Sequence, residues 1–249
     1  MSDRVVVITG ASAGIGAALG EQLGRRGTRV ALVARRADAL TDVVRRCDGH
    51  GLAVVADMTR RADAARVVAE TLTAFGSIDV WINNVGRGIS RPAAELTDDD
   101  IDDMMRVNVK SALYGIQAVL PHFKARGSGH IINVSSMLGR MPMATFRSAY
   151  NGAKHFLNAV TANLRDDLAQ SHPGIAVSLV SPGVVRTEFG VNAMHGGPDS
   201  RTLPNSQSAE EVAAVVAGVI ESRAKDVYTR PGARQMVLDY LGALAQDPS

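Results

Sequence analysis

Short apolar runs alternate with amphipathic stretches along most of the chain. The apolar runs are rich in Val and Ile and almost continuous, which is typical of strands that are buried on both faces. They occupy 4–9, 29–34, 52–56, 80–84, 130–135 and 175–181. The stretches that repeat their apolar residues at helical spacing occupy 15–26, 37–47, 62–75, 100–120, 150–168 and 209–222. This alternation predicts an α/β fold of three layers, in which helices cover both faces of a mostly parallel sheet. Right-handed crossovers between the strands make that sheet doubly wound.

One segment, residues 188–208, lacks both patterns. It contains Pro198 and Pro204 and has little periodicity. Long irregular segments are uncommon in compact domains and are either functional loops or disordered ones. Composition alone leaves both alternatives open, but the segment follows the last core strand, and ligands of such sheets bind at the carboxyl ends of strands. We therefore expect a single domain, residues 1–249, with a substrate lid at about 188–208.

Composition and charge change this picture little. The chain has 249 residues, of which 46% are hydrophobic and 21% charged, as in ordinary globular proteins. Its net charge is +2, and its basic residues form isolated pairs rather than the blocks typical of nucleic-acid binding. No apolar run approaches the length of a membrane span, and the N-terminus lacks a signal-peptide pattern. The single Cys47 cannot form an intrachain disulfide. We expect a cytoplasmic protein with no nucleic-acid partner and no membrane association.

The sequence TGASAGIG, from Thr9 to Gly16, joins the first predicted strand to the first predicted helix. Glycines in such a turn permit a positive φ angle, a close approach of the backbone to a pyrophosphate, and close packing of helix on strand. The N-terminus of the helix then directs its unsatisfied N–H groups at the phosphates. A tight turn without a ligand is the alternative, and the strand–turn–helix context favours a dinucleotide.

Three side chains offer proton-transfer chemistry. Tyr150 and Lys154 stand four residues apart at the start of a predicted helix, so they share one face of it. The ordinary pKa of tyrosine, about 10, is too high for a base at neutral pH, but a neighbouring ammonium lowers it and makes the pair a usable acid and base. A surface Tyr–Lys pair is the alternative that these two residues alone leave open. Ser136 follows the strand at 130–135, and its hydroxyl can hydrogen-bond a substrate oxygen.

Four motifs occur in order along the chain: TGxxxGIG at 9–16, NNVG at 83–86, SSxxG at 135–139 and YxxxK at 150–154. Each is weak alone. Together, in this order and on these predicted elements, they resemble the short-chain dehydrogenase/reductase family over roughly residues 4–228. The resemblance implies a Rossmann fold with a mostly seven-stranded parallel sheet. It also implies an oxidoreductase that interconverts a ketone or aldehyde and an alcohol by hydride transfer.

The resemblance assigns catalytic roles as well. Ser136 would hold the carbonyl oxygen, Tyr150 would act as acid and base, and Lys154 would keep Tyr150 acidic and grip the nicotinamide ribose. Asn108 would hold a water that links Lys154 to solvent, with a solvent-facing Asn108 as the alternative. Ser136 and Tyr150 lie fourteen residues apart, one more than in many members, and the loop between them could absorb the extra residue. If Met137 took the place of the serine instead, the site would be lost.

The cofactor is predicted from the end of the second strand, where Ala34 is followed by Arg35 and Arg36. NAD-binding proteins generally have an acid here for the ribose hydroxyls, whereas arginine fits the 2′-phosphate of NADP. A solvated arginine pair is the alternative, but it leaves the missing acid unexplained, so we expect NADP(H). By resemblance, the other cofactor-binding residues are Gly10, Ser12, Gly14, Ile15, Gly16, Asp57, Asn84, Gly86, Tyr150, Lys154, Pro182, Gly183 and Thr187.

The motifs leave one alternative function open. A non-catalytic NADP(H)-binding sensor or scaffold could use the same fold, although such proteins usually lose one member of the Asn–Ser–Tyr–Lys set. The expected partners are a small carbonyl or alcohol substrate and further copies of the chain, in a homodimer or homotetramer. No metal ligands are assigned.

The substrate pocket is expected to be partly apolar. Its candidate wall residues are Met137, Leu138, Met141, Met143, Phe146, Phe189, Val191, Met194 and Leu203. An acyl-carrier partner would require a basic patch near the pocket, for which Arg140, Arg147 and Arg186 are the candidates.

Overall fold

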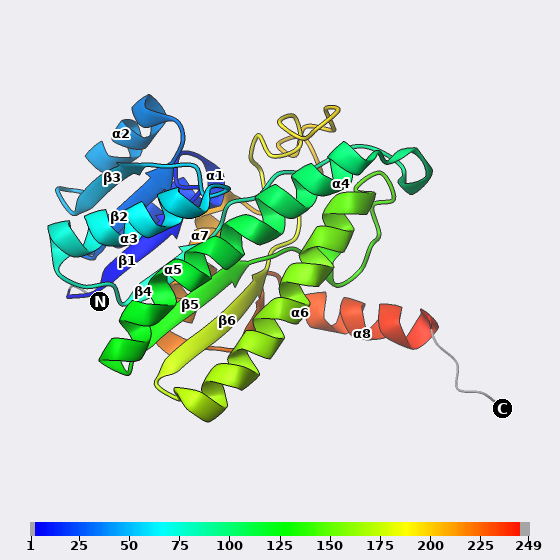
Figure 1. Ribbon diagram of the computed structural model, residues 1–249. Helices are drawn as coiled ribbons and strands as arrows, with labels where there is room; N and C mark the ends of the chain where they lie inside the picture. Colours follow the sequence, from blue (N-terminus) through cyan, green and yellow to red (C-terminus); the bar gives the residue numbers. More distant parts are fainter. Residues whose placement is uncertain (1–2, 245–249) are drawn as a thin grey trace.

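The computed structural model describes residues 3–244. Its strands form one sheet in the order β3-β2-β1-β4-β5-β6-β7, and every neighbouring pair is parallel. They are β1 (Val5–Thr9), β2 (Arg29–Ala34), β3 (Gly51–Val55), β4 (Val80–Asn83), β5 (Gly129–Val134), β6 (Ile175–Ser181) and β7 (Asp226–Tyr228). Figure 1 shows helices in front of and behind this sheet. The predicted doubly wound, seven-stranded Rossmann fold is confirmed.

Two apolar layers enclose the sheet, and successive strand residues alternate between them. Val6 and Ile8 of β1 belong to one layer and Val7 to the other. The first layer contains α1 (Gly14–Gly24), α2 (Ala37–Arg45) and α7 (Ala209–Ser222), and the second contains α3 (Arg61–Phe75), α5 (Ser111–Arg126) and α6 (Ser148–Ser171). Because both faces are removed from water, hydrophobic burial favours apolar residues at every position of the inner strands.

The helix predicted at 100–120 consists of three consecutive segments. α4 (Asp98–Met105) runs into a π-helical turn, η2 (Arg106–Lys110), before α5 begins. π-turns inside α-helices are rare and frequently lie at functional sites. This one carries Asn108.

The C-terminal region contains two elements that the sequence pattern does not locate. β7 is a short edge strand that pairs with the end of β6, and it is followed by α8 (Ala233–Leu244). β7 is not fully buried, so it lacks the continuous apolar run of the inner strands. The buried residues of α8 pack on Met137 and Met141, in the connection after β5.

A cavity of about 1450 Å³ opens at the carboxyl ends of the strands. β1 and β4 are neighbours, and the strand order changes direction between them, which is where doubly wound sheets bind their ligands. Part of the segment 188–208, yellow in Figure 1, forms one wall of this cavity. A bridge between Ile89 and Met194 joins the segment to the connection after β4.

No helix within residues 3–244 is long and apolar enough to cross a bilayer. The expected domain spans 1–249, so its residues 1–2 and 245–249 lie outside the described range.

Candidate active site

The turn between β1 and α1 has the backbone shape that its glycines permit. Gly10 and Gly14 have φ angles of 68° and 56°, in the left-handed region that side-chain-bearing residues seldom enter. Gly16 allows close packing, because a Cβ atom there would lie 2.5 Å from the Gly10 carbonyl oxygen. The N-terminus of α1 therefore lies at the cavity, in the position from which helix N–H groups bind phosphate.

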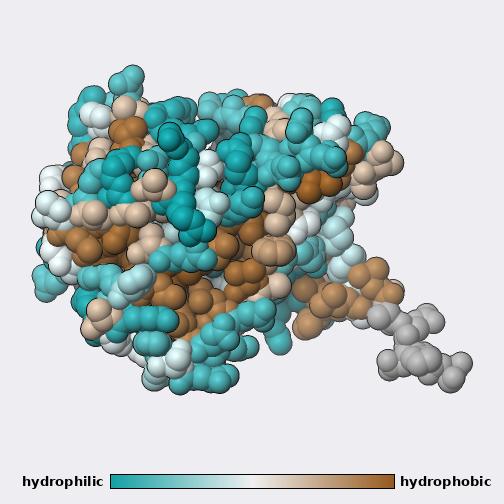
Figure 2. Space-filling view, in the orientation of Figure 1, coloured by the Kyte–Doolittle hydropathy of each residue, from teal (hydrophilic) through white to brown (hydrophobic). Residues whose placement is uncertain are grey.

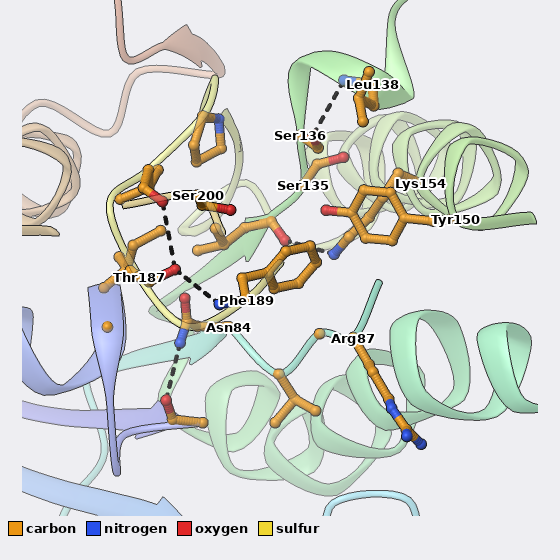
Figure 3. Close-up of a pocket in the computed structure, with 18 of the residues that line it drawn as sticks. Asn84, Arg87, Ser135, Ser136, Leu138, Tyr150, Lys154, Thr187, Phe189 and Ser200 are labelled. Carbon is orange, nitrogen blue, oxygen red and sulfur yellow. Dashed lines mark hydrogen bonds between the residues drawn. The ribbon is translucent and has the colours of Figure 1, made fainter. Parts of the chain in front are cut away.

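Asn84 joins the turn after β4 to the turn after β1. Its side-chain amide donates to the carbonyl oxygens of Thr9 and Gly10, each at 3.2 Å, and its backbone N–H donates to the Thr9 hydroxyl at 3.0 Å. Gly14 faces Thr187, since a Cβ atom on Gly14 would lie 3.1 Å from the Thr187 Cγ2. These turns and the segment after β6 together enclose one crevice (Figure 3).

The turn after β2 gives the cavity a basic corner. Arg35 and Arg36 are exposed and line the cavity, and the Arg36 guanidinium donates to the Ser12 hydroxyl at 3.2 Å. Asp57 lines the cavity too, but its carboxylate accepts hydrogen bonds from the Thr59 N–H and hydroxyl, at 3.0 and 2.8 Å. No ion pair within residues 3–244 involves Arg35 or Arg36, so no carboxylate of the described chain neutralises the charge of this corner.

Ser136, Tyr150 and Lys154 gather on one side of the cavity, across from Asn84 and Thr187 in Figure 3. The Ser136 hydroxyl lies close enough to the Tyr150 phenol to lower its pKa. Tyr150 and Lys154 lie one turn apart on α6, with the Lys154 Nζ 5.8 Å from the centre of the Tyr150 ring. The fourteen-residue spacing from Ser136 to Tyr150 is therefore compatible with their meeting.

Neighbouring groups fix these side chains in place. The Ser136 hydroxyl accepts from the Leu138 N–H at 3.1 Å, and the Lys154 ammonium donates to the Val134 carbonyl oxygen at 3.1 Å. Met137 packs in the apolar cluster under α8, so Ser136, not Met137, stands beside Tyr150.

Burial dominates the pKa values of Tyr150 and Lys154. It raises the pKa of Tyr150 to about 12, and the hydrogen bond with Ser136 and the positive charge of Arg147 offset this only in part. Burial lowers the pKa of Lys154 to about 8. The pKa of Tyr150 is therefore above its ordinary value, whereas the sequence predicts one below it, because desolvation favours the neutral form of both groups.

Asn108 is buried, so the solvent-facing alternative is wrong. Its amide nitrogen donates to the carbonyl oxygens of Arg87 and Met104, at 3.0 and 3.1 Å, and its Oδ1 accepts from the Arg87 N–H at 3.1 Å. Gly86 separates it from Lys154: a Cβ atom on Gly86 would lie 3.2 Å from the Asn108 Oδ1 and 3.7 Å from the Lys154 Nζ. The π-helical turn is in this way tied to the turn after β4.

The motifs do not single out Asn158, which holds the loop after β5. Its side-chain oxygen accepts from the Ser135 hydroxyl at 2.5 Å, and its amide donates to the Gly139 carbonyl oxygen at 2.7 Å. Asn158 thereby fixes the loop on both sides of Ser136. The sequence signal that could have identified it is its position on α6, where it continues the four-residue spacing of the Tyr–Lys pair.

Most of the predicted site residues line the cavity. They are Ser136, Tyr150, Lys154, Gly10, Ser12, Gly14, Ile15, Arg35, Arg36, Asp57, Asn84, Gly86, Pro182, Gly183 and Thr187. Gly16 and Asn108 do not line it; they lie behind its wall and support it.

The predicted apolar wall forms in part. Met137, Leu138, Met143, Phe146, Phe189 and Leu203 line the cavity. Val191 is exposed, Met194 packs with Ile89, and Met141 is buried under α8, so these three do not contribute.

The candidate basic patch does not form. Arg140 pairs with Asp226, Arg186 donates to the Ser206 carbonyl oxygen at 3.2 Å, and Arg147 is buried. The three arginines therefore do not present one exposed surface to an acyl-carrier partner.

The cavity fits a nicotinamide dinucleotide on its own geometry. Its glycine turn stays open only without side chains, since a Cβ atom on Gly10 would lie 3.2 Å from the Val85 backbone. The helix N-terminus there can bind a pyrophosphate, and the arginine corner can bind a further phosphate. The paired hydroxyls of Ser136 and Tyr150 can bind a carbonyl oxygen and protonate it.

Comparisons with known proteins agree with this geometry. The sequence profile of the short chain dehydrogenases matches residues 4–196. An uncharacterized oxidoreductase of Staphylococcus saprophyticus is 35% identical over 191 residues, which cover 75% of this chain and 80% of that protein. A short-chain dehydrogenase from Sphingobium yanoikuyae, solved in complex with NADPH, is 31% identical with a TM-score of 0.82 and covers 99% of this chain and 97% of its own. A short chain dehydrogenase/reductase from Burkholderia phymatum in complex with NAD has a TM-score of 0.87, with the same coverage, but only 23% identity; that likeness shows the fold.

Proposed function

This chain belongs to the short-chain dehydrogenase family and is an oxidoreductase, and we propose that it interconverts a ketone or aldehyde and an alcohol with NADP(H), using Tyr150 as acid and base. One observation carries the proposal. Ser136, Tyr150 and Lys154 line the same cavity as the glycine turn, with Lys154 5.8 Å from the centre of the Tyr150 ring.

The mechanism follows from the protonation states of these groups. NADP(H), when bound, supplies or accepts the hydride. In the reducing direction, Ser136 binds the carbonyl oxygen and Tyr150 gives that oxygen its proton. A pKa of about 12 keeps the Tyr150 phenol protonated at neutral pH, as a donor must be. Lys154, with a pKa of about 8, is mostly charged at neutral pH and offsets the negative charge that Tyr150 then acquires. The oxidising direction uses the same groups in reverse.

Asn108 completes the proposed catalytic set. Its amide nitrogen donates to two backbone oxygens, and within residues 3–244 its Oδ1 accepts one hydrogen bond, from the Arg87 N–H. An amide oxygen has a second lone pair, which is available to a water on the side of Lys154. This arrangement supports the assignment of Asn108 to a proton path between Lys154 and solvent.

The choice of NADP(H) over NAD(H) rests on Arg35 and Arg36. Both line the cavity at the end of β2, where the adenosine ribose of a dinucleotide lies in this fold. Replacing Arg35→Asp is expected to weaken NADPH binding at least about tenfold and to leave NADH binding nearly unchanged, because only NADPH carries the phosphate that the guanidinium contacts. Fluorescence titration with each cofactor measures the difference.

Arg26→Asp is the matched control for this prediction. It makes the same charge change at an exposed residue that does not line the cavity, and it should alter neither affinity. Equal losses of NADPH and NADH affinity in Arg35→Asp would remove the role assigned to Arg35.

We also propose that the chain associates with copies of itself. Apolar side chains stand exposed along α8 and on α6, among them Leu238, Leu241 and Phe156, and Figure 2 shows brown surface over α8. Exposed apolar patches of this kind mark interaction surfaces.

The activity is tested by following NADPH absorbance in the presence of aliphatic and aromatic ketones and aldehydes, and NADP⁺ reduction with the corresponding alcohols. Consumption that depends on a carbonyl compound supports the proposal. Tight binding of NADPH without turnover of any compound in either direction would favour the non-catalytic sensor instead.

A further inference from the structure

Arg147 is a buried cation beside the proposed proton donor. It immediately precedes α6, one turn before Tyr150, and only 6% of it is exposed although it lines the cavity. Burial lowers the pKa of its guanidinium, and its positive charge in turn lowers the pKa of Tyr150. Because arginine stays charged in proteins, Arg147 places a permanent positive charge beside the proposed proton donor, Tyr150.

No carboxylate among residues 3–244 neutralises Arg147. Its Nη1 donates to the Ile89 carbonyl oxygen at 3.1 Å, and none of the ion pairs formed within the described chain includes it. The nearby buried carboxylate of Asp100 is already taken by Arg91, at 2.8 Å, and by His195, at 2.7 Å. The described chain therefore supplies no counter-ion for this cation. Because a buried charge is costly unless it is paired, an anionic ligand at this place would stabilise it.

The guanidinium of Arg147 is held in place by close contacts with its neighbours. A Cβ atom on Gly88 would lie 2.7 Å from its Nη1, and one on Gly197 would lie 3.0 Å from its Nη2. The ring of Phe146 lies 5.2 Å from the guanidinium carbon. Two backbone segments and an aromatic ring therefore hold the group in place, while the cavity remains open to it.

The start of α6 adds to the positive potential at this place. The helix has no acidic residue in its first turn, and no side chain caps its N-terminus. The helix dipole therefore favours an anion in the same region as the guanidinium.

We infer that the substrate carries a carboxylate, and that Arg147 binds this group while Ser136 and Tyr150 bind the carbonyl or alcohol oxygen. This inference rests on the proposed function and names the substrate class for it. Within residues 3–244 the guanidinium of Arg147 donates one hydrogen bond, to the Ile89 carbonyl oxygen, which leaves other guanidinium N–H groups for a bidentate contact that would also orient the substrate. Arg147 and Tyr150 line the same cavity, so a keto acid can present its carboxylate to one and its carbonyl oxygen to the other.

The test compares acids with neutral analogues. Keto acids with the carbonyl α, β or γ to the carboxylate are assayed beside their methyl esters at saturating NADPH. For at least one spacing, kcat/KM for the acid is expected to exceed that for the ester at least about tenfold, as hydrogen bonds to charged groups imply. Arg147→Met is expected to abolish this preference and Arg147→Lys to retain part of it.

Arg186→Met serves as the control. Arg186 also donates to a backbone oxygen, but it does not line the cavity, so its loss should leave the preference for acids unchanged.

A binding measurement separates this inference from the proposed function. Butanoate and hexanoate are titrated against the NADPH complex beside their amides, with nicotinamide fluorescence as the readout. Tighter binding of the carboxylates by at least about tenfold, lost in Arg147→Met, supports the anion site even if no keto acid is turned over. Carboxylates that bind no better than amides, or esters reduced as well as acids, would overturn it while leaving the reductase function intact. If Arg147→Met does not fold, these wild-type comparisons decide the matter alone.

Discussion

At the residue scale, burial sets the protonation states on which the proposed chemistry depends. Sequence spacing places Tyr150 and Lys154 on one face of a helix, and from this alone the ammonium is expected to acidify the phenol. In the folded protein both side chains are enclosed, and burial raises the pKa of Tyr150 and lowers that of Lys154. The result is a phenol that remains a proton donor at neutral pH and a lysine that loses its charge not far above it.

The pH dependence of carbonyl reduction should therefore report Lys154. We expect the titration of Lys154 to leave kcat/KM, measured at saturating NADPH, constant below pH 8. As the pH rises through about 8, kcat/KM should fall. The neutral amine can no longer offset the negative charge that forms on Tyr150. In Lys154→Arg the side chain stays charged, so the alkaline limb should move to higher pH. A limb that stays at the same pH in Lys154→Arg would belong to a different group.

At the element scale, the sequence predicts the strands and helices whose burial gives them a regular pattern of apolar residues. The inner strands are visible because they are largely apolar, and the edge strand β3 is visible because its sequence, GLAVV, is an apolar run despite partial exposure. β7, with only three residues that begin at Asp226, has no such run and escapes the pattern. The π-turn at Arg106–Lys110 escapes as well, because one extra residue hardly disturbs helical spacing over so short a stretch. The site motifs follow strand ends and helix starts, which the pattern places correctly.

Contacts between distant segments are what the sequence does not reveal. Asn158 is a site residue only because the loop after β5 folds back on α6. Arg147 is buried only because Gly88 and Gly197, from two other segments, close around it. Neither set of contacts corresponds to a regular spacing of residues in the sequence, so neither can be predicted from it.

The turn after β4 and the π-helical turn should be sensitive to a single methyl group. In Gly86→Ala the new Cβ would lie 3.2 Å from the Asn108 Oδ1, so the Asn108 amide must shift, while the Lys154 Nζ at 3.7 Å would be in ordinary contact. We expect kcat/KM to fall by about tenfold to a hundredfold, as for other small displacements of catalytic groups. A fully active Gly86→Ala would contradict this account of the turn.

Gly152→Ala is the control from the same region. Gly152 lies on α6 with no atom near the position of a new Cβ. Since alanine is the better helix former, the free energy of unfolding should rise by up to about 1 kcal/mol, with activity unchanged.

At the scale of the whole molecule, the end of the sheet away from the cavity contains a buried titratable group. His130, near the start of β5, shares a 2.8 Å hydrogen bond between its Nε2 and the Ser178 hydroxyl of β6. Burial, helped by the charges of Arg223 and Arg4, lowers the pKa of His130 from its ordinary value to about 4.

Acid should therefore destabilise the fold through His130. Between pH 6.5 and about 4 the unfolded chain binds a proton that the folded protein does not, so stability is lost as the pH falls through this window. The loss attributable to this group is about 3 kcal/mol. His130→Gln keeps a polar partner for Ser178 without titrating, and its free energy of unfolding should decline less over the same range. Denaturant titrations at several pH values compare the two proteins, and parallel declines would exclude His130 as the source.

The central claim is that Tyr150 transfers the proton, and Tyr150→Phe tests it most directly. The substitution keeps the ring, which packs edge-on against Phe189 with 5.5 Å between ring centres, and removes only the hydroxyl. The measurement is NADPH affinity and carbonyl turnover for wild type and variant, side by side. We predict unchanged NADPH binding with turnover reduced by about a hundredfold or more, the contribution typical of a general acid. A variant that binds NADPH and reduces the carbonyl at the wild-type rate would contradict the mechanism.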